Sequence, residues 1–184
     1  KNGVRVAILA YCSVLKEGYA AGPHNAGIAP LRVHTYYEPV QYQPGVPPRV
    51  VTVPYPEDLE GMVEDIAAAK KAAHVVALSL HWGIHHIPRL IAEYQPVIAA
   101  AAFKAGADLI LGHHAHVPKA IAVHNGKVCF YSLGNFIFST VSAQKSGWAE
   151  AFAKLWGQYG VFPDPDEYPR LSMGKDAKRS LIAK

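Results

Sequence analysis

The sequence has few charged residues and no long apolar run, and each shortage excludes a class of protein. Of its 184 residues only 17% are charged and 51% are hydrophobic, which indicates a folded domain rather than a disordered tail. No run approaches the ~18 consecutive apolar residues of a membrane helix, so we expect no membrane segment in this chain. The net charge of +4 is spread along the sequence without a basic run, and we therefore expect no nucleic-acid partner.

Cysteine is also scarce. The only two cysteines, Cys12 and Cys129, both lie in apolar runs typical of strands. A buried free thiol is the more common state of such a residue, so we expect neither a disulfide nor a metal-binding pair. The chain opens with Lys1-Asn2-Gly3 and enters an apolar run at once, so it is expected to contain no signal peptide or membrane anchor.

Apolar runs alternate with helical patterns through the first two thirds of the chain. The expected strands cover Val4 to Tyr11, His74 to Leu80 and Asp108 to Leu111, and the expected helices begin at Pro56 and cover Ile91 to Ala105. This order, β-α-β-α-β, predicts a partly parallel sheet with helices on its faces, the first strand being covered on both sides. A segment rich in proline and glycine, Ser13 to Pro54, is predicted to be a long surface excursion.

The second part of the chain has a different pattern. Asn125-Gly126, flanked by short apolar runs, predicts an antiparallel hairpin added to the sheet. A short helix is expected at Trp148 to Tyr159. We therefore divide a single 184-residue domain into an α/β core, 1–139, and a C-terminal extension, 140–184.

Histidines follow two of the predicted strands directly. His81, His85 and His86 come after the first of these strands, and His113, His114 and His116 come after the second. Loops that leave the carboxyl ends of parallel strands meet at one edge of a sheet, where ligands bind in α/β proteins. Imidazole is a common ligand of zinc, iron, nickel and copper, so the pattern predicts a metal site.

The spacing His114-x-His116 allows one loop to provide a ligand to each of two metal ions. We expect Gly112 to let the backbone turn sharply there. No carboxylate cluster accompanies the histidines, and Asp108 precedes its strand at the opposite edge. Hydrogen-bonded histidines without metal are the alternative. Asn135, in a glycine turn, is either a plain turn residue or a support for a metal ligand.

Three segments together resemble one protein family. HWGIHHIPRLIAEYQ, GADLILGHHAHVPKAI and GKVCFYSLGNFIF look like the CapA family of bacterial capsule-synthesis proteins, named for poly-γ-glutamate capsule biosynthesis. That family is part of the calcineurin-like metallophosphoesterase superfamily. The resemblance is clearest from about Ala69 to Phe138 and looser from Val4 to Leu31. It implies an α/β sandwich of mixed sheets flanked by helices, with metals at strand ends.

The resemblance also implies a ligand set. His114 and His116 match the histidine pair of the superfamily's last motif, and His81 matches the isolated histidine before it. In the hypothesis that follows, His81 and His114 hold one divalent ion and His116 the other, the metal being iron, manganese or zinc. GHHAH contains one histidine more than the motif, so His113 leaves the alignment of this segment with the motif ambiguous. His85 lies near a position that is acidic in versions of the motif. Both are candidate ligands or supports, as is Asn135.

The family's earlier aspartate, asparagine and histidine motifs do not occur here, and the first residue is not methionine. We therefore expect an incomplete domain whose N-terminal half would be its partner. Three functions are open: metal-dependent hydrolysis of a phosphoester or related bond, non-catalytic binding of an anionic polymer in capsule assembly or export, and no function without the missing motifs. The last predicts exposed apolar surface. The resemblance implies a cell-surface or extracytoplasmic location.

Overall fold

A computed structural model describes residues 2–138, 148–163 and 173–183. Its main sheet has five strands in the order β1-β4-β5-β7-β6. These strands are β1 (Val6–Cys12), β4 (Val75–His81), β5 (Leu109–His113), β6 (Ile121–His124) and β7 (Lys127–Phe130). β1, β4, β5 and β7 run parallel, and β6 pairs with β7 antiparallel. The mixed α/β fold with a largely parallel sheet is as expected.

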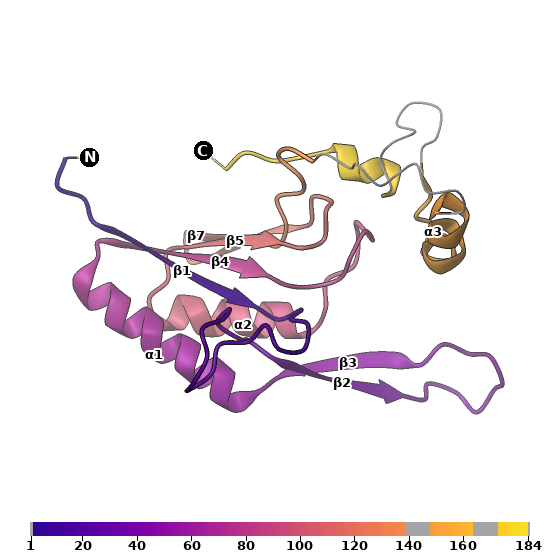
Figure 1. Cartoon of the computed structure of the whole chain (residues 1–184), viewed down its shortest axis with the longest axis horizontal. Coiled ribbons are helices and arrows are strands. Elements are labelled where there is room, and N and C mark those ends of the chain that lie inside the picture. Colours follow the sequence, from indigo (N-terminus) through magenta and orange to yellow (C-terminus); the bar gives the residue numbers. More distant parts are fainter. Residues whose placement is uncertain (1, 139–147, 164–172, 184) are drawn as a thin grey trace.

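Two helices, α1 (Pro56–Ala72) and α2 (Tyr94–Ala105), lie on the same side of this sheet (Figure 1). α1 begins with a proline and two acidic residues and ends with two lysines, as the helix dipole favours. α2 begins three residues later than expected and ends at Gly106, whose φ of 119° is left-handed. The core forms between these helices and the sheet, and its fully buried members include Ile66, Leu78, Ile98 and Ile110.

The described residues leave the opposite face of the sheet open at its edge strands, which corrects the prediction that the first strand is covered on both sides. Val6 and Ile8 of β1 are 57% and 72% exposed, while Leu9, which points to the helices, is partly buried against the core. Ile121 and Val123 of β6 lie at the other edge and are also exposed. β1 is an edge strand, and both helices pack on the far side. The apolar run of β1 therefore packs against the core through only one of its two faces.

The excursion from Ser13 to Pro54 is more ordered than predicted. It contains a two-stranded antiparallel hairpin, β2 (Val33–Glu38) and β3 (Arg49–Pro54), which projects from the body of the molecule (Figure 1). The sequence pattern missed these strands because both faces of the hairpin are largely exposed, so neither carries a sustained apolar alternation.

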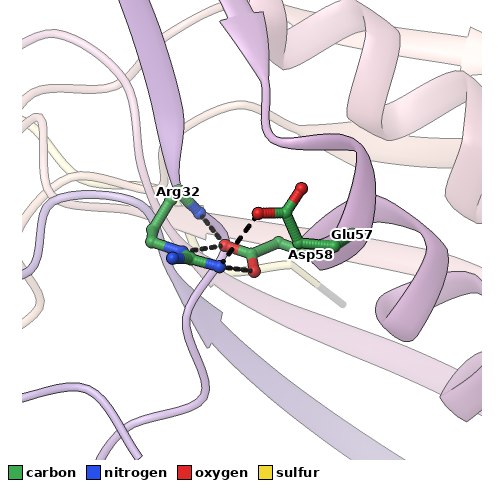
Figure 2. Close-up of polar contacts among 3 residues, drawn as sticks. All are labelled: Arg32, Glu57 and Asp58. Carbon is green, nitrogen blue, oxygen red and sulfur yellow. Dashed lines mark hydrogen bonds and ion pairs between the residues drawn. The ribbon is translucent and has the colours of Figure 1, made fainter.

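Arg32 fixes the start of this hairpin to α1. Figure 2 shows its guanidinium reaching Glu57 and Asp58 in the first turn of the helix. The Nη2 to Asp58 Oδ1 distance is 2.6 Å, Nε lies 2.8 Å from Asp58 Oδ2, and the Arg32 backbone N–H donates to the same oxygen. The bidentate contact sets the direction in which β2 leaves the body.

The remaining elements largely follow the predictions. Asn125 and Gly126 both have positive φ and join β6 to β7 as a tight hairpin turn. The predicted C-terminal helix is α3 (Trp148–Trp156), followed by the 3-10 turn η1 (Gly157–Tyr159), and a second 3-10 turn, η2, covers Lys175–Lys178. Cys12 and Cys129 are buried free thiols, as expected. The proposed core boundary at residue 139 falls outside the described residues.

None of the described helices is long and apolar enough to cross a membrane.

Candidate functional site

Three loops converge at the carboxyl ends of β4, β5 and β7. Backbone hydrogen bonds tie them together: His86 N–H donates to the Ala115 carbonyl at 2.9 Å, and Leu133 N–H donates to the Gly112 carbonyl at 3.0 Å. The buried Trp82 adds an indole N–H bond of 3.0 Å to the Tyr131 carbonyl. Loops that are far apart in the sequence are therefore held in one fixed arrangement, and they carry the histidines.

His81 and His114 form the closest histidine pair. His81 is the last residue of β4, and its Nε2 lies 3.2 Å from Nδ1 of His114. Two imidazole nitrogens bound to one tetrahedral zinc, each about 2.05 Å from the metal, are separated by about 3.3 Å. The spacing of this pair therefore fits two ligands of one ion.

His116 is oriented by Asn135. Its Nδ1 lies 2.7 Å from Asn135 Oδ1, while the Asn135 amide N–H groups donate to the carbonyls of His116 and Ala177. Because Oδ1 can only accept, His116 must donate from Nδ1, and its Nε2 carries the free lone pair. A metal-binding histidine is typically held in this way.

His85 and His86 join the cluster from the loop after β4. The His85 ring stacks on His114 with 3.7 Å between centroids and lies 5.7 Å from His116. His86 is buried, and no partner for its Nδ1 is found among the described residues. Helix α3 closes this side, since the Trp156 ring lies 5.1 Å from His86 and 6.2 Å from His85. This role of α3 was not predicted from the sequence. The strongly amphipathic pattern of the helix was the signal that could have indicated it.

Burial favours the neutral form of His81, His85, His86 and His114. Burial, the largest cause, and the neighbouring imidazoles together lower the pKa of His114 and of His86 to about 3 and that of His85 to about 4. The pKa of His81 is also lowered, first by burial and then by His113 and His116. These four imidazoles therefore offer free lone pairs at neutral pH, which is the state that binds a metal.

The structure also separates the histidines that the sequence left ambiguous. His113 pairs with His81 in the sheet register, but no ring contact joins it to the cluster within the described part of the chain. His114 makes that contact instead. Gly112 does not have a positive φ, contrary to expectation; a Cβ there would lie 2.2 Å from the Tyr131 carbonyl oxygen. Its role is to allow close approach of two chain segments.

The donor set fits a metal only in part. Among the described residues no group of three or more His, Cys, Asp or Glu side chains is arranged to hold a metal ion. The His81–His114 pair and the oriented His116 have the geometry of metal ligands, but no carboxylate from residues 2–138, 148–163 or 173–183 is found in contact with them to balance the charge of a metal.

Comparison with known proteins identifies the family. The profile described as "Bacterial capsule synthesis protein PGA_cap" matches residues 1–140, which include all six clustered histidines and Asn135. The chain belongs to this family. The PGA_cap match also covers the whole five-stranded sheet and both helices packed on it.

Two curated PGA_cap relatives are similar over most of the chain. The PGA biosynthesis protein CapA of Bacillus subtilis (strain 168) is 33% identical over 160 residues, which are 86% of this chain and 33% of that protein. The capsule biosynthesis protein CapA of Bacillus anthracis is 28% identical over 159 residues, 86% of this chain and 31% of that protein. The chain thus spans about a third of the length of these relatives.

Proposed function

We propose that this chain contributes the histidine side of a two-metal hydrolase site that acts on a phosphoester or related bond in capsule synthesis. The observation that carries the proposal is the 3.2 Å spacing of the His81 and His114 nitrogens at the ends of two adjacent parallel strands. The named relatives support a role in poly-γ-glutamate (PGA) capsule biosynthesis and a location at the cell envelope.

The chain's own residues have separate tasks in this proposal. His81 and His114 hold one divalent ion, iron, manganese or zinc, and His116 holds a second. Asn135 orients His116 through its Nδ1 and leaves Nε2 available as the ligand atom. His85 and His86 pack around these ligands and, with Trp156, limit the access of water. Bound metals would acidify a water molecule and stabilise charge on the reacting phosphoryl group.

Metal binding tests the proposal. We expect the chain to bind Mn²⁺ or Zn²⁺ in calorimetric titration, and His81→Ala, His114→Ala and His116→Ala each to weaken the binding at least tenfold. The matched control is His24→Ala, outside the cluster, which should bind as the parent does. Equal affinity of the parent and all three cluster variants would contradict the proposal. Metal-dependent hydrolysis of p-nitrophenyl phosphate, lost in the same variants, would extend it to activity.

A non-catalytic site for an anionic polymer is less well supported by the geometry. Lys119, whose charge acts on His85 and His86, is buried, and its ammonium donates to the carbonyls of Ile87 and Leu90. It organises the loop rather than facing a ligand. Binding of poly-γ-glutamate by the parent and by the three histidine variants alike, without metal, would favour this function instead.

A further inference from the structure

A cavity of about 840 Å³ lies beside the histidine cluster. One wall is the hairpin β2–β3, the floor is the loop between β4 and α2, and the other wall is the end of α3 with η1. The volume is within the range of about 300 to 1,000 Å³ that is usual for small-molecule sites. Neither the histidine hypothesis nor the names of the relatives assigns a ligand to it.

The lining of the cavity is mostly apolar. Its aliphatic members are contributed by all three walls and include Val33, Val50, Ile84, Ile87, Leu90 and Leu155. Trp156 and Tyr159 add aromatic surface. Such a lining favours an aliphatic chain over a charged polymer, because each buried methylene contributes roughly 0.8 kcal/mol.

The polar groups of the lining mostly have partners within the protein. Ser13 Oγ lies 2.7 Å from the Tyr94 hydroxyl, and Thr52 Oγ1 accepts the Tyr94 backbone N–H. Among the described residues of the lining, Glu93 alone is charged, and it forms an ion pair of 2.8 Å with Arg49. No Lys, Arg or His side chain lines the cavity in the part of the chain that the structure describes, so this lining favours an apolar group over an anion.

The cavity adjoins the histidine cluster through shared neighbours, although its lining includes none of the clustered histidines. Gly83, Ile84 and Ile87 line it and belong to the same loop as His85 and His86. Trp156 forms part of the cavity wall and also contacts both of these imidazole rings. A molecule lying along the cavity would therefore bring one end to the cluster.

We propose that the cavity binds the aliphatic chain of an amphiphilic phosphoester, with its phosphoryl group directed toward His85 and the cluster behind it. This inference rests on the proposed function for the phosphoester end of the substrate. It adds the substrate class: a phosphate monoester or diester that carries a hydrocarbon chain, rather than a small polar phosphate or the capsule polymer itself.

The test is calorimetric titration of the whole chain with n-butyl, n-hexyl and n-octyl phosphate, below their micelle concentrations and with EDTA present. We expect the affinity to rise at least tenfold from butyl to octyl, since each methylene buried in an apolar site gains up to roughly fourfold. EDTA separates this result from metal binding, so failure of the metal titration would leave the cavity inference standing.

The variant Val50→Asn/Leu155→Asn places polar groups on both walls of the cavity. Its control is Val53→Asn/Ala151→Asn, on the same strand and the same helix but outside the lining. Val50 and Val53 are similarly exposed, at 49% and 45%, so the two substitutions should affect folding alike. We expect octyl phosphate to bind the cavity variant at least fivefold more weakly, and the control within twofold of the parent.

Two results would overturn the inference. One is equal affinity for the three esters in the parent chain. The other is a chain-length dependence that persists in the cavity variant, because the hydrocarbon would then be held elsewhere, for example on the open face of the sheet.

Discussion

At the scale of single residues, the site depends on unusual backbone positions. His86, His114 and His116 have φ values of 57°, 88° and 58°, a region that residues with a side chain seldom occupy. Strain of this kind costs on the order of 1 to 3 kcal/mol at each position and persists only where the surroundings enforce it. Here the backbone bond from His86 to Ala115 and the contacts of Asn135 do so. The imidazoles converge as a result.

Gly112→Ala tests the close approach that these loops require. The added Cβ would lie 2.2 Å and 2.6 Å from the carbonyl oxygens of Tyr131 and Phe130, which cannot move independently of the sheet. We expect a loss of about 1 to 3 kcal/mol in the free energy of unfolding, measured by urea denaturation. Gly61→Ala is the control: in the exposed part of α1, with open space around it, the same change should stabilise by roughly 0.5 to 1 kcal/mol. A neutral Gly112→Ala would refute the packing argument.

At the scale of elements, the hairpin β2–β3 depends on its attachment to α1. Arg32 links the two through Asp58, whose side chain is only 7% exposed. Burial raises the pKa of this carboxyl, but the hydrogen bonds and charge of Arg32 outweigh it, so the pKa is lowered from 3.8. Because the hairpin forms one wall of the cavity, this ion pair also positions the proposed binding surface.

Arg32→Met should lower the free energy of unfolding by about 1 to 2 kcal/mol at neutral pH, because it leaves a buried carboxylate without its partner. The folded pKa of Asp58 lies below its unfolded value, so the difference from the parent should persist above pH 3.8 and disappear as the pH falls through the lowered pKa.

The control for this prediction is Arg49→Met, whose partners Glu38 and Glu93 are 57% and 43% exposed, and it should cost less than about 0.5 kcal/mol. Equal losses in both variants, measured by chemical denaturation at neutral and acidic pH, would argue against a special role for the Arg32 contact.

At the scale of the whole molecule, the sheet has one covered and one open face. Ile110 on the covered face is fully buried, while Ile8 on the other is 72% exposed. Exposed apolar surface of this kind commonly packs against another segment or partner. The matched relatives, about three times as long as the aligned segment, have further chain that this structure does not describe.

The two isoleucines allow a matched test of this asymmetry. Ile110→Ala should lower the free energy of unfolding by about 2 to 5 kcal/mol, because it opens a cavity in the core. Ile8→Ala removes little buried surface and should cost less than about 1 kcal/mol. Urea denaturation followed by circular dichroism would measure both losses of free energy. A large loss for Ile8→Ala would mean that the open face is covered in solution.

The sequence alone determined the order of the strands and helices of the main α/β unit, though not the β2–β3 hairpin, and the edge at which the site forms. The helical spacing, the run from Val75 to Leu80 and the Asn125-Gly126 turn are local signals. The elements that they predict lie within a few residues of their predicted places. The histidines after β4 and β5 had to meet because parallel strands end at one edge.

Only the tertiary structure decided which side chains touch. His114 rather than His113 meets His81 because its positive φ turns the chain after β5, and no sequence pattern encodes that angle. Asn135 contacts His116 across 19 positions of sequence, and Trp156 of α3, which is more distant in the sequence, packs against His86. The sequence also did not determine whether one or both faces of the sheet are covered, because a short apolar strand has the same pattern in either case.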